Sequence, residues 1–454
     1  MLNKIYQSRL ILPGLQILTL LVFLLIIAGA FGITTDDKSF ASILRNTNFS
    51  NLIVWSYWWP LIIVSAILFG RIWCSICPME LVTSFFGRVG LKRKPGKLLK
   101  SGWIVTLFYG IILVLGIHTY AIHRIPHYMS LYMLILFVVA IIAGIYWEKR
   151  TFCTYLCPIG HLLGFYSLLS FKSLRVKEES VCASCKTKDC ISKVSHYKFI
   201  GRSCTSELYP AKLIDNRDCI LCGQCHKSCS KDNIAIKTNS FASGLFTPAT
   251  VNWAQISFMV VVSGFVIYEI FVEWSVTKEI IMSGPKLIND MLNVTGKASG
   301  TVKALLLFVF IPFIFYLLLA ASRKVISKES LKQIFTQLII AILPITAFTH
   351  LVKALYKTTS RFPYWKYVFS DPIGEQTAGL IRSGDLLISK ENVMLMADWI
   401  TIFAILLTSG AWILSLFIIK KQHIDSLWSR SVSILAVSIY AAIFLSAFVA
   451  RLMA

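Results

Sequence analysis

Charged side chains are scarce in this chain of 454 residues. Asp, Glu, Lys and Arg together make up 15% of it, whereas a typical globular protein contains about 25%. Hydrophobic residues make up 56%, which is more than one soluble core can bury, because such cores stop growing near ~250–300 residues. The same numbers exclude a disordered chain, a collagen and a small disulfide scaffold. We therefore expect a membrane protein.

Acidic residues are rarer than basic ones, with 22 Asp and Glu against 45 Lys and Arg, a net charge of +23. A nucleic-acid binder could carry this charge, but the apolar fraction argues against a nucleic-acid partner. The 12 cysteines are too few for a disulfide framework in a chain of this length, and their spacing indicates another role.

Long uncharged stretches predict nine membrane-spanning helices, each near or above the ~20 residues that cross the hydrocarbon. They are residues 10–35, 46–70, 101–123, 125–147, 238–268, 304–322, 333–352, 399–419 and 431–450. A tenth uncharged stretch, 151–171, contains two cysteines and a proline, so we predict a helix on the membrane surface there. Residues 353–398 are predicted to be a long outer loop.

Basic residues orient these spans, because Lys and Arg accumulate on the cytoplasmic side of a membrane. With the N-terminus in the cytoplasm and the C-terminus outside, the inner segments hold 31 of the 45 Lys and Arg. These inner segments are 1–10, 71–102, 148–240, 322–332 and 420–430. They also hold all 12 cysteines, in a compartment that keeps thiols reduced. We predict a multi-pass protein of the bacterial inner membrane, in contact with its lipid.

The cysteines nearest the centre of the chain have the spacing C-x2-C-x2-C-x3-C. This spacing is typical of bacterial [4Fe–4S] ferredoxins, in which the fourth cysteine ligates the other cluster of a pair. Gly223 tolerates the positive φ that a tight loop around a cluster needs. The four residues are Cys219, Cys222, Cys225 and Cys229, in CILCGQCHKSC.

A second set of cysteines precedes this motif, so an exchange between two clusters is expected. One cluster would be held by Cys182, Cys185, Cys190 and Cys229. The other would be held by Cys219, Cys222, Cys225 and Cys204. The alternative is a zinc ribbon, which uses C-x2-C pairs but does not account for C-x2-C-x2-C-x3-C.

The remaining cysteines form two pairs, each followed by a proline and each after a predicted span. An arginine stands three residues before the first cysteine of each pair (Arg71 and Arg150), so the pattern is an internal repeat. Proline suits the first turn of a helix, which would place the thiols near a helix N-terminus. The four could form a third iron–sulfur or other metal site, two redox dithiols, or buried small side chains. They are Cys74 and Cys77 in CSICP, and Cys153 and Cys157 in CTYLCP.

At these residues, over about 50–240, the sequence resembles the NapH- and NosR-type membrane ferredoxins, which have twin cysteine–proline motifs followed by a two-cluster ferredoxin. It departs from them in the first motif, which is C-x2-C-P instead of C-x3-C-P. The resemblance implies a chain that carries electrons between membrane quinol and a redox partner such as a respiratory reductase. An assembly factor that supplies electrons or metal to a respiratory metalloenzyme is the alternative, and a cluster-based redox sensor is a third interpretation.

The expected fold is an all-α polytopic membrane protein with an inserted two-cluster ferredoxin domain. We predict a membrane domain at 1–171, the cytoplasmic ferredoxin domain at 172–240, and a C-terminal membrane domain of five helices at 241–454.

Protonatable residues in or near the outer half of the predicted helices suggest where a quinol could release its protons. The candidates are His118, His350 and Asp398. Bis-histidine haem b is a competing interpretation for the histidines, because it requires two imidazoles that face each other across helices. The residues for that interpretation are His118, His123, His127 and His350.

Overall fold

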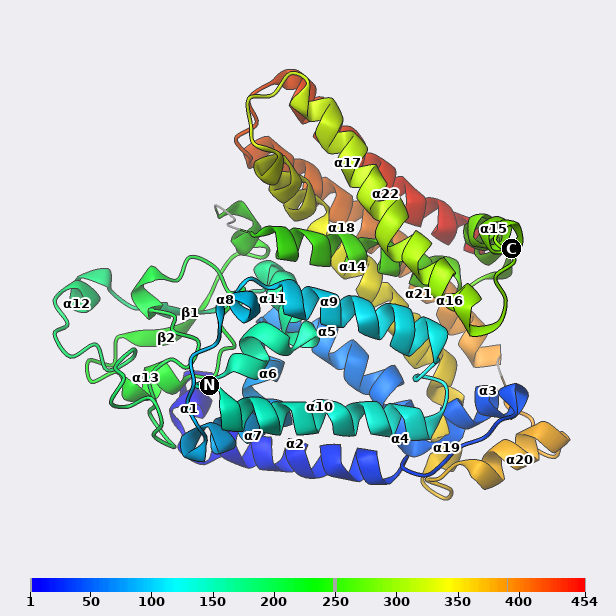
Figure 1. The fold of residues 1–454 in the computed structure, drawn as a ribbon, viewed down its shortest axis with the longest axis horizontal. Helices are drawn as coiled ribbons and strands as arrows, with labels where there is room; N and C mark the ends of the chain where they lie inside the picture. The colour runs from blue at the N-terminus through cyan, green and yellow to red at the C-terminus, as the bar shows by residue number, and fades with distance from the viewer. Residues whose placement is uncertain (1, 248–250, 390, 454) are drawn as a thin grey trace. The chain divides into compact units, whose positions relative to one another are not determined.

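Helices dominate the computed structural model (Figure 1), which describes residues 2–247, 251–389 and 391–453. Up to residue 169 the elements are α1 (Leu2–Gln7), α2 (Ile11–Ala28), α3 (Lys38–Thr47), α4 (Phe49–Ile53), η1 (Val54–Trp58), α5 (Trp59–Phe69), α6 (Ile72–Ile76), α7 (Pro78–Val89), α8 (Lys97–Lys100), α9 (Trp103–Ile111), η2 (Ile112–Thr119), α10 (Pro126–Tyr146), η3 (Phe152–Leu156), α11 (Pro158–Tyr166) and η4 (Ser167–Leu169).

The rest of the chain contains two strands and the remaining helices. They are β1 (Lys172–Val176), α12 (Glu179–Ala183), η5 (Pro210–Lys212), α13 (Gln224–Ser228), β2 (Ile234–Thr238), η6 (Ser243–Phe246), α14 (Trp253–Phe271), α15 (Ser275–Met291), α16 (Gly296–Leu305), η7 (Leu306–Phe310), α17 (Ile311–Lys324), α18 (Leu331–Arg361), η8 (Phe362–Tyr364), α19 (Trp365–Val368), α20 (Glu375–Ser383), α21 (Glu391–Lys421) and α22 (Leu427–Met453).

The chain divides into two compact units, and each is assembled from separate stretches of sequence. Unit 1 consists of residues 1–28, 61–105 and 130–247. Unit 2 consists of residues 29–60, 106–129 and 248–454. All 12 cysteines therefore belong to unit 1.

Eight helices within the described part of the chain are long and apolar enough to cross a membrane, so the chain has the makeup of a multi-pass membrane protein. They are Ile11–Ala28, Phe49–Phe69, Pro126–Tyr146, Trp253–Phe271, Gly296–Lys324, Leu331–Val368, Glu391–Lys421 and Leu427–Met453. Each coincides with one of the nine predicted spans. The helix start that shifts most is that of the fifth span, which begins only after Asn252, because the side chain of Asn252 caps it.

The third predicted span forms a shorter apolar helix, Trp103–Thr119. Thr106 near its start donates a hydrogen bond of 2.9 Å to the carbonyl of Ala254, and the ring of His118 near its end lies 5.0 Å from that of Tyr268. Ala254 and Tyr268 lie near opposite ends of α14, so the shorter helix runs beside α14 for most of its length. Its 17 residues are at the lower limit of the ~17–25 that span a bilayer.

The prediction of a surface helix at 151–171 is wrong. This stretch folds as η3, α11 and η4, and the side chains on nearly every side of α11 and η4 are buried. A Cβ atom at Gly164 would lie 2.7 Å from the carbonyl oxygen of Arg217, so the cysteine-rich segment packs directly on α11. A segment later in the chain covers the face that was expected to meet lipid headgroups.

The long outer loop predicted at 353–398 is also largely helical. The helix α18 continues to Arg361, and α21 begins at Glu391. Between them, α20 packs against α3, where the Thr47 hydroxyl donates a hydrogen bond of 2.8 Å to the carbonyl of Gly374.

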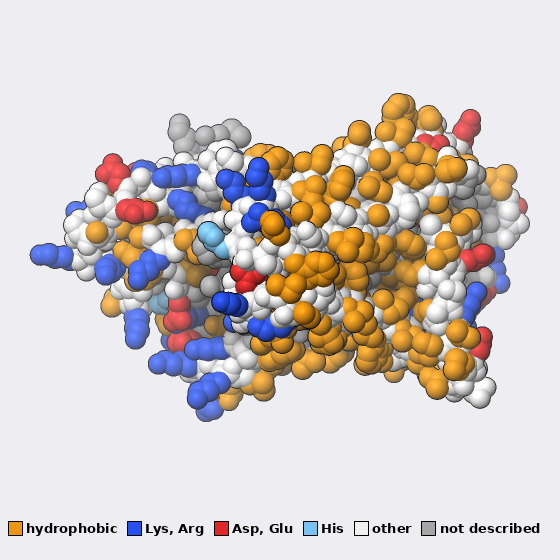
Figure 2. All heavy atoms as spheres, turned by 90° about the horizontal axis from the view of Figure 1, so that it is seen from above, with side chains coloured by type: hydrophobic (Ala, Val, Ile, Leu, Met, Phe, Trp, Pro, Cys, Tyr) orange, Lys and Arg blue, Asp and Glu red, His pale blue; other side chains and the backbone are white. Residues whose placement is uncertain are grey.

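The cysteine-rich segment of unit 1 begins and ends on a two-stranded antiparallel sheet. Lys172 pairs with Thr238, and Val176 pairs with Ile234, so the sheet closes the base of the segment and the cysteine loops extend from it. Helix α1 packs against α13 and β2. On the face that Figure 2 shows, Lys and Arg side chains gather toward the left-hand end of the view, whereas hydrophobic side chains dominate the middle of the view.

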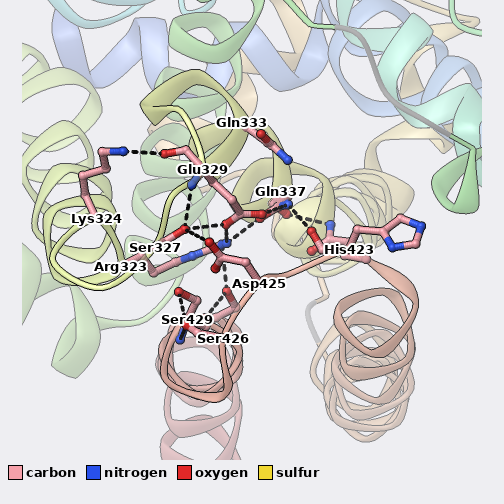
Figure 3. Close-up of polar contacts among 12 residues, drawn as sticks. Arg323, Lys324, Ser327, Glu329, Gln333, Gln337, His423, Asp425, Ser426 and Ser429 are labelled. Atoms are coloured by element: carbon pink, nitrogen blue, oxygen red, sulfur yellow. Dashed lines mark hydrogen bonds and ion pairs between the residues drawn. The ribbon is translucent and has the colours of Figure 1, made fainter.

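In unit 2, the central helix is α18, which packs against α14, α17, α21 and α22. A buried polar network joins the ends of several of these helices (Figure 3). The fully buried Arg323 forms an ion pair of 2.5 Å with Glu329 and donates a hydrogen bond of 3.0 Å to Ser433. Gln337 also donates to Glu329. A buried guanidinium is stable only with such partners, so this network fixes α17, α18 and α22 to one another.

Candidate functional site

The first predicted set of four cysteines is brought together in unit 1. Cys182, Cys185, Cys190 and Cys229 line one pocket beside Tyr209. Burial, together with the neighbouring thiols of the other three cysteines, raises the pKa of Cys190 to about 11. Cys229, from the later loop, therefore joins the three cysteines of the earlier loop.

The second predicted set is also brought together. Burial raises the pKa of Cys225 well above its usual value, and the adjacent thiols of Cys222, Cys204 and Cys219 add to this effect. Burial likewise raises the pKa of Cys219 to about 12. Cys204, from the earlier loop, lies with the three cysteines of the later motif, in the exchanged arrangement that the ferredoxin-type spacing predicts.

Hydrogen-bond donors point at the sulfur atoms of the first set. The side-chain amide of Asn233 donates a bond of 3.2 Å to Cys182 Sγ, and its backbone N–H donates a bond of 3.4 Å to Cys229 Sγ. Such donors stabilise negative charge on sulfur and raise the reduction potential of a bound iron–sulfur cluster. Asn233 stands at the start of β2, so the sheet holds it in position.

Gly223 has the positive φ that the sequence predicts, at 66°. A Cβ atom there would lie 2.5 Å from Cδ1 of Tyr6, whose ring comes from α1. The N-terminal helix is held over the motif by two further contacts, because Lys227 donates to the carbonyl of Ser8 and the backbone of Ile236 donates to Asn3. The glycine is therefore required both by the turn and by the close approach of Tyr6.

The two cysteine–proline repeats form a third set of four thiols. Burial raises the pKa of Cys77, and the thiols of Cys74 and Cys157 raise it further. Burial also raises the pKa of Cys153, next to Cys157 and Cys77. The sequence left open whether these four would meet, and the fold brings them to one place.

A π-helical turn absorbs the difference in spacing between the two repeats. Cys74 lies in the α-helix α6, three residues before Cys77, whereas Cys153 lies in the π-helix η3, four residues before Cys157. The N–H of Cys157 donates a bond of 2.9 Å to the carbonyl of Phe152, five residues earlier. Because a π turn holds one residue more than an α turn, the extra residue need not alter how the second pair presents its thiols.

Both repeats place their second cysteine at the start of a helix, as the sequence predicts. Cys77 is the N-cap of α7 and Cys157 is the N-cap of α11, and a proline follows each at the first helical position. The N–H of Gly160 donates a bond of 3.3 Å to Cys157 Sγ. The free N–H groups at a helix start favour an anionic sulfur.

The arginine of each repeat contacts both its own motif and the cysteine-rich segment. Arg71 hydrogen-bonds Cys74 and donates a bond of 3.0 Å to the carbonyl of Arg217. Arg150 lies near Cys153 and hydrogen-bonds Cys222. Arg150 therefore lies between the third set of thiols and Cys222 of the second set, and Arg71 lies beside Cys74 and Cys157 of the third set, where both positive charges can offset thiolate charge.

Glu80 is the anionic partner of this region. Its side chain is 2% exposed and lies 2.6 Å from Arg150 and 2.5 Å from Arg202. Burial alone would raise the pKa of Glu80, but the two guanidinium groups lower it to about 2. The residue ties the first repeat to the second repeat and to the cysteine-rich segment.

The donor chemistry of the three sets suits iron–sulfur clusters. All 12 cysteines are free thiols, and four thiolates are what a [4Fe–4S] cluster requires. Across the described ranges, no three His, Cys, Asp or Glu side chains converge closely enough to hold a single metal ion. The residues whose thiols could hold a cluster are the two ferredoxin-type sets and the third set from the repeats.

Unit 2 contains a separate group of ionisable residues within its apolar helices. Lys353 on α18 forms ion pairs with Glu269, on α14, and with Glu273 just beyond it. Glu269 lies within electrostatic range of the predicted quinol residues His118 and His350. Charged residues inside a membrane are costly, and they usually mark a path for protons or substrate.

The three predicted proton acceptors have different surroundings. The imidazole of His118 lies 4.8 Å from the Phe308 ring, which lies 5.7 Å from the Phe265 ring, and this ring lies 6.1 Å from His350. The two histidines are thus connected by a series of aromatic contacts. Asp398 instead forms an ion pair of 2.9 Å with Arg451.

The sequence-based prediction missed Glu80, Arg202, Glu269 and Lys353. A signal was present for Glu80, which is an acid in the first turn of the helix after the first cysteine–proline motif. Lys353 and Glu269 each stand next to the end of a predicted span, where a charge was taken to mark the boundary. Their burial depends on helices that are distant in sequence.

Comparison with known proteins identifies the repeat. A family model described as a 4Fe-4S binding domain matches the chain twice, at residues 51–97 and 129–176. The two matches contain the two cysteine–proline motifs and lie outside the cysteines at 182–229. They support iron–sulfur binding at the site that the sequence alone left most open.

Two relatives from Methanocaldococcus jannaschii match part of the chain. Uncharacterized protein MJ0750 is 24% identical over 193 residues, which cover 38% of this chain and 75% of that protein. Uncharacterized protein MJ0749 is 28% identical over 180 residues, which cover 37% of this chain and 65% of that protein. No solved structure matches the chain. These similarities show two stretches that are similar to a 4Fe-4S binding domain, and the described part of the chain also contains eight long apolar helices.

Proposed function

We propose that the protein transfers electrons between membrane quinol and a redox partner protein through [4Fe–4S] clusters at the cytoplasmic face of the bacterial inner membrane. The observation that carries the proposal is the gathering of 12 free thiols into three neighbouring sets of four. The double match to a 4Fe-4S binding domain supports it. Clusters of this type take up and release one electron at a time, which is the chemistry that such a relay needs.

The chain's own residues support transfer between the sets. Cys190 is an electrostatic neighbour of Cys225, and Arg150 links Cys222 to Cys153. This contact pattern favours electron transfer from the repeat cysteines to the set that contains Cys204, and then to the more exposed set that contains Cys185. That last set lines a surface pocket, where a partner protein could approach.

The quinol part of the proposal is supported by the ionisable residues of unit 2. Oxidation of a quinol releases two protons with its two electrons, so acceptors for protons must be present. His118 and His350 are titratable groups within apolar helices. Glu269 lies within electrostatic range of both histidines and forms an ion pair with Lys353. Asp398 is a further candidate at its ion pair with Arg451.

Metal and sulfide analysis of anaerobically purified protein tests the cluster proposal. Three sets predict about twelve irons and about twelve acid-labile sulfides per chain. The double variant Cys74→Ser/Cys77→Ser should lose about four of each, and Cys182→Ser/Cys185→Ser should lose a different four. Electron paramagnetic resonance should lose a different signal in each variant. Zinc in place of iron, or unchanged iron in both variants, contradicts the proposal.

A second experiment tests the electron donor. A menaquinol analogue added to the oxidised protein in detergent should reduce its clusters, and His118→Leu should slow this reaction while the iron content stays constant. Clusters that no quinol reduces would refute the quinol role. A deletion strain that keeps quinol oxidation but makes a reductase without its metal would favour the assembly function instead.

A further inference from the structure

A small pocket of unit 1, apart from the cysteine sets, is lined mainly by hydrogen-bond donors and positive charges. It lies between α7 and the residues around 195–205, and Lys149 reaches it from the connection after α10. Its polar lining residues are Ser84, Arg88, Lys149, His196, Arg202 and Thr205. Apart from Arg202, which pairs with Glu80, none of these residues has a role in the site or in the proposed function.

Three buried atoms of this lining have no hydrogen-bond partner among the residues that the structure describes. They are His196 Nε2, Arg202 Nε and Thr205 Oγ1, and their residues are 7%, 6% and 8% exposed. All three can donate a hydrogen bond, since His196 carries its proton on Nε2 when its Nδ1 accepts from the Ser203 hydroxyl at 3.0 Å. A buried donor without an acceptor is unfavourable, so the fold holds three donors at a stability cost.

The basic residues around the pocket differ in their carboxylate partners. Arg202 shares Glu80 with Arg150, and Lys149 forms ion pairs with Glu148 and Glu207. The contacts of Arg88 are instead a hydrogen bond of 3.2 Å to the carbonyl of Tyr197 and the ring of Phe199, 3.8 Å from its guanidinium carbon. The guanidinium of Arg88 is therefore only partly used by the protein.

We propose that this pocket binds a phosphate group. A phosphate is acceptor-only and negative, so it complements donors that lack acceptors, and the planar guanidinium of arginine suits its geometry. The position of the pocket is compatible with two sources of that group. Helix α7 exposes Phe85 and Val89 beside a basic run, and Lys92 from that run lies 4.7 Å above the Tyr197 ring. A lipid headgroup and free phosphate are the two sources.

A bound phosphate would connect α7 to the segment 195–205, which contains Cys204. His196 and Thr205 belong to that segment, whereas Ser84 and Arg88 belong to α7. The phosphate would act as a structural cofactor that holds the cysteine-rich segment on the helix after the first repeat. This role does not depend on the direction of electron transfer or on the identity of the partner.

Binding is tested on the full-length protein after delipidation, in a phosphate-free neutral detergent. Inorganic phosphate is one probe, and micelles containing phosphatidylglycerol are the other, with sodium chloride at equal ionic strength and diacylglycerol of the same chains as blanks. The readouts are the thermal unfolding midpoint and the hydrogen exchange of residues 195–205. Either probe should raise the midpoint and slow exchange in this segment, and the blanks should not.

Two variants remove the pocket in different ways. Arg88→Gln removes a positive charge that has no carboxylate partner, and His196→Phe/Thr205→Val removes two buried donors. Each should weaken the affinity for the effective probe about tenfold or more, because a hydrogen bond to a charged group contributes about 1.5–3 kcal/mol. Arg93→Gln is the matched control, since Arg93 is an exposed residue of the same basic run that stacks on Tyr146.

The outcomes separate cleanly. A response to phosphatidylglycerol alone identifies a lipid headgroup, and a response to inorganic phosphate identifies the free anion. Either result supports a phosphate site if the pocket variants lose the response and Arg93→Gln keeps it. The proposal is overturned if sodium chloride gives the same response or if Arg93→Gln and Arg88→Gln behave alike. It is also overturned if folded wild-type protein responds to neither probe.

Discussion

Removing the charge of Glu80 should destabilise unit 1 by about 3–5 kcal/mol, which is the usual cost of breaking a buried ion pair by deleting one partner. In Glu80→Gln the side chain keeps its shape, but Arg150 and Arg202 lose the carboxylate that lies 2.6 and 2.5 Å away. Two buried guanidinium groups would then lie close together without a counter-ion. The effect belongs to the upper range of single substitutions.

Chemical denaturation in detergent, followed by tryptophan fluorescence, measures this loss. Hydrogen exchange in α7 should also increase. The matched control is Glu207→Gln, because Glu207 forms an ion pair with Lys149 but its side chain is 64% exposed. An exposed pair contributes about 0–1 kcal/mol, so this variant should resemble the wild type.

A double variant tests the physical cause. Adding Arg202→Gln to Glu80→Gln removes one of the two unpaired charges, so it should recover part of the stability that Glu80→Gln loses. A coupling of that sign is expected only for residues in direct contact. If Glu80→Gln is no more damaging than Glu207→Gln, the explanation of Glu80 as the anion that joins the repeats is refuted.

Three other substitutions have defined outcomes. Gly223→Ala places a methyl group at a φ of 66° and 2.5 Å from the Tyr6 ring. The left-handed backbone costs about 1–2 kcal/mol, and the clash with Tyr6 should distort the cysteine loop and lower the iron content. Full iron loading would contradict this. Asn233→Leu removes the amide donor at Cys182 Sγ and should lower the reduction potential of one cluster in a redox titration, while equal shifts in every cluster would contradict it. Arg323→Met leaves a buried carboxylate unpaired and should cost about 3–5 kcal/mol in denaturation, against a change within about 1 kcal/mol for Arg382→Gln at an exposed pair.

The helices that cross a membrane could be read from the sequence because lipid imposes a local rule. A run of about 20 apolar residues can satisfy its backbone hydrogen bonds only as a helix, so the eight long helices coincide with predicted spans. The rule fails where burial comes from protein instead of lipid. The sequence predicts a surface helix at 151–171 because its apolar run is too short to span, but the side chains of α11 and η4 are buried and Gly164 packs against Arg217 of the cysteine-rich segment.

Part of the cysteine arrangement could be predicted from the sequence. The spacing of Cys219, Cys222 and Cys225 and the positive φ at Gly223 are local properties, so they could be predicted. The pairing of Cys204 with that motif also agrees with the exchanged ligation expected from its spacing. The meeting of Cys77 with Cys157 could not be derived from spacing, because it depends on how two repeats pack.

The sequence by itself determined which residues could serve as thiol ligands and which stretches could enter a bilayer, since both follow from side-chain type and short-range spacing. Only the tertiary structure decided that Glu80, Arg150 and Arg202 share one buried site, and that a π turn absorbs the extra residue before Cys157. It also decided that three residues with unpartnered buried atoms line one pocket. These features join segments far apart in the chain. The strength of these interactions depends on the exclusion of water around the charged groups, and no single segment of the chain can exclude that water alone.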